Sequence, residues 1–147
     1  MITLKFTGQP FMQTSIAMPT ANDRLIGSIP SQIINSARSI NTAYDGRMVE
    51  LNVAAWLQLA GLESLPVSLM ASYMDGPQHR EVAVEHGRVG AKGKVLLSGI
   101  ARMGIKQNLQ QVQIFLRSAV PAQSMLVEEL FVQAVEQISS NSRQVSA

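Results

Sequence analysis

The feature that most constrains the fold is a stretch of alternating apolar and polar residues, Lys92 to Ser118. From 95 to 103 the odd positions are apolar or small, and the even positions include a serine and an arginine. From 110 to 117 valine, isoleucine and leucine alternate with glutamines and an arginine. Because successive side chains of a strand leave opposite faces of a sheet, this period predicts two half-buried strands of roughly ten residues.

A short segment, Gly104 to Asn108, separates the two runs. Gly and Asn tolerate the backbone angles of turns, so we predict that the two strands pair as an antiparallel hairpin. Gly99 falls inside the first strand, where a glycine often marks a bulge or a close approach of another backbone.

Alternation predicts further strands at Met1–Gly8, Leu65–Met74 and His79–Val89. The segment Arg47–Leu62 is ambiguous. Its odd positions are apolar, as in a strand, yet residues 54–61 are good helix formers that end in a glycine. We interpret residues 47–58 as a strand and keep a helix as the alternative.

Two helices are predicted. In the first, residues 30–44, Ser28 and Pro30 suit a helix start, apolar residues recur at spacings of three and four, and Gly46 follows the end. In the second, residues 124–138, the apolar positions fall on one helical face, Ser124 can cap the start, and two glutamates lie near the first turn.

The predicted fold class is therefore α+β: an antiparallel sheet of about five to seven strands, with the helices at about 30–44 and 124–138 packed on it. A chain of 147 residues fits one domain. We assign residues 1–138 to a single globular domain and the polar residues 139–147 to a disordered tail.

Composition excludes several classes of protein. The chain has no cysteine, so disulfides, thiolate catalysis and cysteine zinc sites are ruled out. The first residues lack the pattern of a signal peptide, and the apolar segment 53–62 is too short to span a membrane. We expect a cytoplasmic protein without a membrane partner.

Charged residues make up 15% of the chain, against roughly 25% in an ordinary soluble domain. Surfaces with few charges resist association poorly. We therefore expect a non-enzymatic binding or assembly module that self-associates through a low-charge surface, as a homo-oligomer or with a protein partner.

The alternative function is binding of an anion or nucleic acid by the basic segment 80–117, in which arginines and lysines outnumber acids. If one face of the predicted hairpin is solvent-exposed, the polar residues on that face form a basic binding surface. The candidate binding residues are Lys94, Arg102, Lys106, Gln111, Gln113 and Arg117. Nucleic-acid sheets usually add aromatic residues for base stacking, and here only Phe115 is at hand.

Catalytic patterns are weak. No nucleophile-elbow or phosphate-loop motif occurs, so we name no catalytic residue, and we expect neither a cofactor nor a metal. The one enzyme hypothesis uses Asp75, His79 and Glu81, which lie close in sequence and could exchange protons with a small polar substrate.

Overall fold

The computed structural model describes residues 3–10, 22–37, 39–41 and 46–135, and for residues 3–10 it describes the backbone. These residues form nine strands and one short helix, α1 (Ser31–Ser36). The strands are β1 (Thr3–Pro10), β2 (Arg24–Ser28), β3 (Ser39–Asn41), β4 (Arg47–Ala60), β5 (Pro66–Asp75), β6 (Gln78–Arg88), β7 (Lys94–Ile105), β8 (Leu109–Ser118) and β9 (Ser124–Ala134). The predicted α+β class is therefore wrong, because the described chain is almost entirely β-sheet.

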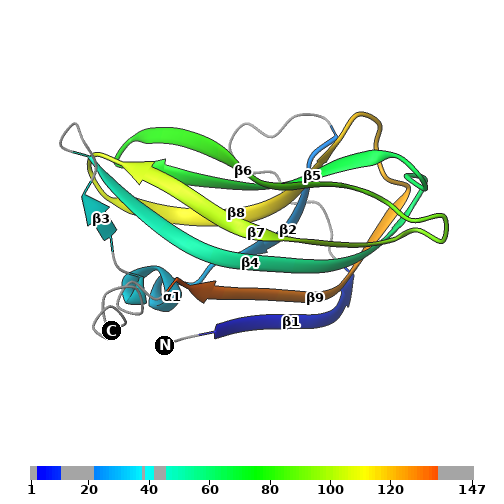
Figure 1. Cartoon of the computed structure of the whole chain (residues 1–147), viewed down its shortest axis with the longest axis horizontal. Coiled ribbons are helices and arrows are strands. Elements are labelled where there is room, and N and C mark those ends of the chain that lie inside the picture. Colours follow the sequence, from blue (N-terminus) through cyan, green and yellow to red (C-terminus); the bar gives the residue numbers. More distant parts are fainter. Residues whose placement is uncertain (1–2, 11–21, 38, 42–45, 136–147) are drawn as a thin grey trace, which may run out of the picture.

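The strands pair from the two ends of the sequence inwards (Figure 1): β1 with β9, β2 with β8, β4 with β7 and β5 with β6, all antiparallel. β4 also pairs with β9, and β5 also pairs with β8. Sheet A thus has the order β1-β9-β4-β7, with the short β3 beside the start of β4, and sheet B has the order β2-β8-β5-β6. This nested pairing in two facing sheets is the topology of a jelly roll.

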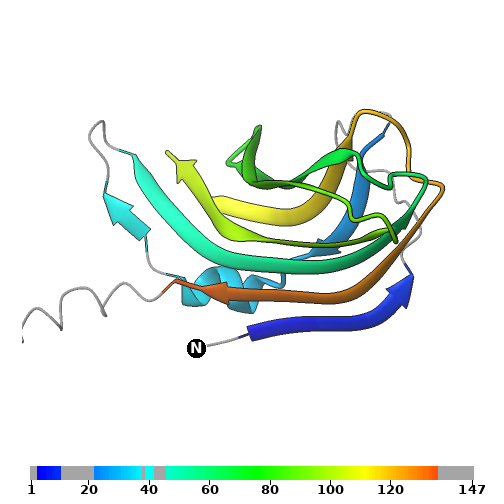
Figure 2. The ribbon, with the colours of Figure 1, turned by 45° about the vertical axis from the view of Figure 1, so that its right-hand side comes forward.

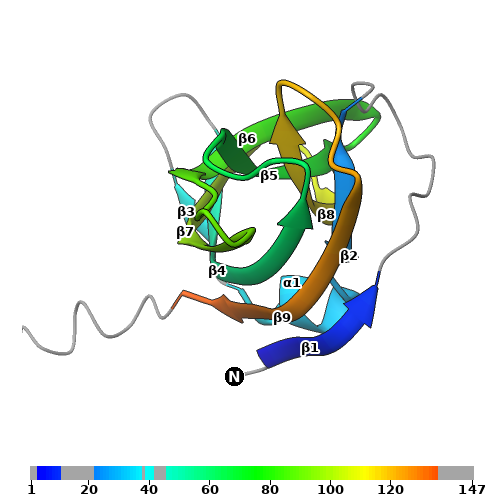
Figure 3. The same ribbon diagram turned by 90° about the vertical axis from the view of Figure 1, so that its right-hand side faces the viewer.

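The core lies between the sheets, which face each other when the molecule is viewed along its long axis (Figure 3). β4 crosses the middle of sheet A and bends along its length together with β7 and β9 (Figure 2). Its inward residues are all buried: Val49, Leu51, Val53, Ala55, Leu57 and Leu59. Full burial of a valine or leucine side chain is worth about 1.5–3 kcal/mol, so β4 contributes strongly to this core. The prediction of a strand at 47–58 is confirmed.

The predicted helix over residues 124–138 is wrong. Its residues up to Ala134 form β9, and the remainder of the predicted helix after Val135 lies outside the described residues. Trp56 of β4 is in register with Glu129, and the next residue, Leu57, is in register with Val127. One residue of β9 is therefore unmatched, which is a β-bulge.

This bulge explains why the strand resembled a helix. Before it the buried residues are the odd ones, Met125 and Val127, and after it they are the even ones, Leu130, Val132 and Ala134. The shift brings apolar residues to positions 127, 130 and 134, spacings of three and four that are typical of a helix. A strand with one inserted residue thus carries the helical period across its middle.

The first predicted helix, residues 30–44, is confirmed over residues 31–36 and is wrong at residues 37 and 39–41. α1 covers six residues, the backbone of Ala37 is extended, and residues 39–41 form β3. Ile33 is the only buried residue of α1, and Ile40, one of the apolar residues within the predicted helix, is 40% exposed in β3. Without a buried stripe there is no packing to extend the helix beyond its first turns. Residues 38 and 42–45 lie outside the described part of the chain.

Both central strands are confirmed as β7 and β8, but the predicted hairpin between them is wrong. β7 pairs with β4 in sheet A, whereas β8 pairs with β5 and β2 in sheet B. Alternation identifies the buried face of each strand, but two strands that cover the same core from opposite sides show the same alternation. Their polar faces consequently lie on opposite outer surfaces of the sandwich.

The other predicted strands are confirmed as β1, β5 and β6. The predicted tail, residues 139–147, lies outside the described residues. Among the residues described, no helix has the length and apolar character needed to cross a membrane.

Candidate functional site

The predicted basic surface is divided by the sandwich. Lys94 and Arg102 lie on the outer face of sheet A, and each has an acidic neighbour. The Lys94 ammonium is 3.9 Å from the Glu128 carboxylate, and Arg102 Nε is 3.0 Å from the Glu50 carboxylate. Each of these two exposed cations therefore already has a carboxylate partner on its own sheet.

The remaining predicted residues lie elsewhere. Gln113 and Arg117 are on the outer face of sheet B, where Gln111 lines the same surface hollow as Gln113. Lys106 is exposed in the link from β7 to β8 at one end of the sandwich. The structure thus brings Gln111 and Gln113 together and separates them from Lys94, Arg102 and Lys106.

The two glutamines belong to a cleft of about 410 Å³ on the outer face of sheet B. Strands β2, β8, β5 and β6 all contribute to it. We call it the polar cleft, and it is lined by Ser28, Ile29, Ser72, Met74, His79, Gln111, Val112 and Gln113. Its lining therefore combines hydroxyl, amide and imidazole groups with apolar surface, and it includes no carboxylate, lysine or arginine of the described chain.

Ser72 is the most informative residue of the polar cleft. It is 7% exposed, and its hydroxyl makes no hydrogen bond to the described chain. A hydroxyl without a protein partner in the wall of a cleft is bonded by water or by a ligand. The position of Ser72 therefore marks a point where a ligand hydroxyl can take the place of water.

Gln111 enters the polar cleft through a local irregularity of β8. The register between β5 and β8 shifts between Ser72 and Met74, and Gln111 has a φ of +54°. A positive φ is unfavourable for a residue with a side chain, and bulges of this kind redirect side chains next to binding sites. The bulge and its strained backbone therefore coincide with a residue that lines the polar cleft.

Gln113 and Ser28 connect the two strands on the other side of the polar cleft. The Gln113 side-chain amide donates a hydrogen bond to the Ser28 hydroxyl at 3.3 Å. The pair is in register across β8 and β2. The amide carbonyl of Gln113 and the hydroxyl proton of Ser28 are left for a ligand, which makes the pair a combined acceptor and donor.

An ion-pair cluster lies on the same face of sheet B, beyond the polar cleft. Arg117 contacts Asp23 at 3.0 Å and Glu81 at 3.1 Å, and its guanidinium lies 5.2 Å from the centre of the Phe115 ring. Hydrogen bonds to Asp23 raise the pKa of Arg117 above its usual value, although burial acts in the opposite direction. The Arg117 guanidinium is therefore held in place by the carboxylates of Asp23 and Glu81.

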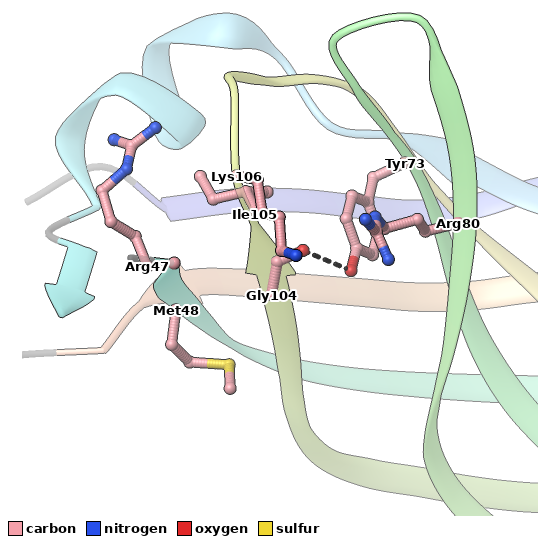
Figure 4. A pocket seen from close by; sticks show the side chains of 8 residues that line it. Arg47, Met48, Tyr73, Arg80, Gly104, Ile105 and Lys106 are labelled. Carbon is pink, nitrogen blue, oxygen red and sulfur yellow. Dashed lines mark hydrogen bonds between the residues drawn. The ribbon is translucent and has the colours of Figure 1, made fainter. Parts of the chain in front are cut away.

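A second pocket, of about 390 Å³, lies at the end of the sandwich where β7 passes into β8 (Figure 4). We call it the basic end pocket, and it is lined by Gly46, Arg47, Met48, Tyr73, Arg80, Gly104, Ile105 and Lys106. Figure 4 shows Arg80 beside Tyr73, whose hydroxyl donates to the Gly104 carbonyl at 2.9 Å, while the Arg47 side chain points away from both.

The carboxylate nearest to the basic end pocket is buried beneath it. Asp75 is 2% exposed and accepts hydrogen bonds from the backbone N–H groups of Lys106 and Gln107 and from Arg80. Burial raises the pKa of Asp75, but these hydrogen bonds and the Arg80 charge outweigh it, so the pKa lies below its usual 3.8. Burial also raises the pKa of Tyr73 above 10.0.

The enzyme hypothesis is not supported by this arrangement. Asp75 points inwards under the β7–β8 link, whereas His79 and Glu81 are in register with outward residues of β5 on the other face of sheet B. The three groups therefore do not converge. Within the described part of the chain, no cluster of three or more His, Cys, Asp or Glu residues could hold a metal ion.

Comparison with known proteins gives no family. No protein-family model and no curated protein matches the sequence. One similar solved structure contains the CBM22-1 and GH10 modules of Clostridium thermocellum endo-1,4-beta-D-xylanase 10B complexed with xylohexaose (TM-score 0.49, 11% identity). The alignment covers 60% of this chain and 17% of the xylanase chain.

Another similar structure is the CBM22-1 xylan-binding domain of Paenibacillus barcinonensis Xyn10C, with a TM-score of 0.45 and 16% identity. Here the alignment covers 68% of this chain and 70% of that one. Neither likeness assigns this chain a family or a ligand.

Sequence reasoning found the glutamines of the polar cleft but missed Ser28, Ser72 and Met74. Ser28 was assigned to a helix cap, whereas it ends β2. Ser72 and Met74 could have been found, because the alternation of β5 already places them on the face opposite its apolar residues. What the sequence does not show is that β2 and β8 bring two more polar residues beside them.

Proposed function

We propose that this protein is a non-enzymatic binding module whose polar cleft takes an uncharged, polyhydroxylated ligand, a carbohydrate. The observation that carries the proposal is the buried Ser72 hydroxyl, which lines the cleft and lacks a hydrogen bond within the described chain. A ligand hydroxyl placed against Ser72 gives it a hydrogen-bond partner within the cleft. The proposal extends the sequence-based expectation of a binding module and changes the nature of its partner.

The chemistry of the lining selects the ligand class. Glutamine amides offer a carbonyl acceptor and two N–H donors, and a sugar hydroxyl both donates and accepts. Gln111, Gln113 and the two serines therefore match a ligand rich in hydroxyl groups, and Met74 and Ile29 provide apolar surface for the faces of its rings. Because no lysine, arginine or carboxylate of the described chain lines the polar cleft, the affinity is expected to be insensitive to salt.

Isothermal titration against uncharged oligosaccharides (xylan, glucan and mannan fragments) tests the proposal. Gln113→Ala and Ser72→Ala each remove one hydrogen-bonding group and should weaken binding about tenfold. The matched controls are Gln110→Ala, beside the cleft on the same strand, and Ser98→Ala, exposed on sheet A; both should bind as the unmodified protein does. Failure of every uncharged oligosaccharide, or binding that survives both cleft variants, would refute it.

A second candidate function is binding of a small anion in the basic end pocket. Three cationic residues line this pocket, Arg47, Arg80 and Lys106. Arg80 is ion-paired with the buried Asp75 at 3.2 Å, and the Arg47 side chain points away from Arg80 (Figure 4). Two of the three come from the basic segment 80–117 of the sequence prediction. They gather at one end of the sandwich, and such a cluster suits a compact anion better than an extended nucleic acid.

Titration with inorganic phosphate and with a generic oligonucleotide at low salt distinguishes the two anion classes. The double variant Arg47→Gln/Lys106→Gln should abolish phosphate binding and leave Arg80 with Asp75 intact. Phosphate binding that is unchanged in this variant, or absent from the unmodified protein, would exclude the basic end pocket as an anion site.

A further inference from the structure

The outer face of sheet A carries a half-exposed tryptophan, called the projection below, beside a hollow. Trp56 of β4 is 46% exposed, and its register partner Leu96 of β7 is 44% exposed. Large apolar side chains side by side on an open sheet face are unusual in a protein that stays monomeric. This pair lies on the sheet opposite to the polar cleft, so it is independent of the proposed function.

The hollow lies two residues from Trp56 along the same strand. It has a volume of about 280 Å³ and is lined by Asn52, Val53, Ala54, Ser98, Gly99, Ile100 and Phe131. It exists because Ala54 has Ser98 as its register partner on one side, so two small side chains meet between Phe131 and Ile100. A cavity of about 150 Å³ accommodates a benzene ring, so the hollow is large enough to receive an aromatic side chain.

We propose that this face associates with a second copy of the chain, with Trp56 of each copy inserted into the hollow at Ala54 of the other. In an interface with two-fold symmetry, a residue i that contacts residue j of the partner is matched by the reverse contact. Trp56 and the hollow at Ala54 lie about 7 Å apart on one strand. Both reciprocal contacts form when the two-fold axis crosses β4 between Ala54 and Trp56.

Neighbouring residues fit the same axis. Asn52 and Gln58 lie on β4 at equal distances on either side of it and on the outer face, so the Asn52 amide of one copy meets the Gln58 amide of the other. Amides pair well because each donates and accepts hydrogen bonds. Leu96 likewise faces Ser98 of the second copy, at the edge of its hollow.

Charge also permits two copies to meet. The charged residues on β4 and β7 of this face are Glu50, Lys94 and Arg102, and the Lys94 and Arg102 side chains already have carboxylate partners at 3.9 and 3.0 Å. The two ion pairs lie along the strands on either side of the apolar residues. Association therefore does not bury an unpaired charge of either pair at the centre of the contact. Along β4 and β7 the centre of the contact is apolar, and Glu129 of β9, the register partner of Trp56 on its other side, is itself engaged within the chain.

The first measurement is sedimentation equilibrium over a range of concentrations. The unmodified chain should dimerise, and Trp56→Ala, which removes the projection, should raise the dissociation constant roughly 30-fold. Ala54→Arg, which fills the hollow and keeps the tryptophan, should do the same. Leu65→Ala removes an exposed leucine outside the sheets and should leave the dissociation constant unchanged. Circular dichroism establishes that each variant is folded.

Mixing the two variants gives the decisive test. The Trp56→Ala chain keeps its hollow, and the Ala54→Arg chain keeps its projection, so a mixed dimer regains one of the two insertions while each variant alone has none. Trp56 is the only tryptophan of the chain, so the mixture fluoresces from the Ala54→Arg chain alone. Its emission should move to shorter wavelength when the Trp56→Ala chain is added.

Three results would overturn the proposal: an unmodified chain that is monomeric at its highest soluble concentration, a dimer unaffected by both variants, or a mixture without a shift in emission. Oligosaccharide binding by the polar cleft is measured separately and is expected to be equal in the unmodified chain and in Trp56→Ala. The failure of one proposal therefore leaves the other standing.

Discussion

Arg117 and Asp23 form a two-point ion pair, in which Arg117 Nε lies 3.1 Å from Asp23 Oδ1 and Nη2 lies 3.0 Å from Oδ2. The pair joins β8 to the residue just before β2, at the edge of sheet B. The Asp23 side chain is 1% exposed, so its charge depends on the hydrogen bonds it receives. The sequence-based hypothesis gave Arg117 a ligand-binding role, whereas the structure gives it a structural one.

Arg117→Met should lower the free energy of unfolding by about 2–3 kcal/mol, because a buried carboxylate loses two hydrogen bonds from a charged partner. Urea denaturation measures the change. Arg102→Met is the matched control: it removes a bond of 3.0 Å to Glu50, but the Arg102 side chain is 60% exposed. A surface pair of this kind is worth at most about 1 kcal/mol. Equal losses in the two variants would contradict the structural role of Arg117.

Asp75 should make the stability dependent on acid pH. Its pKa in the folded chain is below the usual 3.8, so the ionised form stabilises the fold above the unfolded pKa. That stabilisation is lost as the pH falls through the folded pKa. Asp75→Asn should be less stable near pH 7 and should lose less stability between pH 5 and pH 2.5 than the unmodified chain. Parallel urea midpoints across this range would show that Asp75 does not contribute.

Two glycines of β7 should respond in opposite ways to alanine. A Cβ at Gly99 would lie 2.5 Å from the Val84 carbonyl oxygen of β6, where sheets A and B approach each other. Gly99→Ala should therefore cost about 1–3 kcal/mol by overpacking. A Cβ at Gly104 meets no atom within 4 Å, and Gly104→Ala should stabilise by about 0.4–1 kcal/mol. Thermal unfolding compares them, and a destabilised Gly104→Ala would contradict the packing described.

Gln111 should show a conflict between stability and binding. Its φ of +54° is unfavourable for any residue except glycine, so Gln111→Gly should stabilise the fold by about 1 kcal/mol while weakening carbohydrate binding. Ser64 has a φ of +66° outside the polar cleft, and Ser64→Gly should give the stability without the loss of affinity. Undiminished binding by Gln111→Gly would remove Gln111 from the site.

The sequence predicts the strands of this fold well where alternation is unbroken. β5, β6, β7 and β8 alternate throughout most of their length, and all were predicted. β9 was predicted as a helix because one inserted residue at its bulge shifts the buried positions from odd to even. Local patterns cannot distinguish such a shift from a helical period, since only the pairing with Trp56 and Leu57 reveals it.

Strand pairing was beyond local sequence reasoning. The jelly roll joins β1 to β9 and β2 to β8, strands that are far apart in the chain, and no turn residue encodes such contacts. The same limitation divided the candidate site. Gln111 and Gln113 were correctly placed on one outward face, but Lys94 and Arg102 belong to the other sheet, while Ser28 and Ser72 reach the polar cleft through pairings that the sequence does not show.

The most direct test of the polar cleft is amide chemical-shift mapping of ¹⁵N-labelled protein titrated with an uncharged oligosaccharide that binds it. The account predicts saturable shifts of the Gln111 and Gln113 side-chain amides and of the Ser28 and Ser72 backbone amides, with no response from Ser98 on sheet A. Shifts confined to sheet A or to the basic end pocket, with the two glutamine side chains unmoved at saturation, would contradict it.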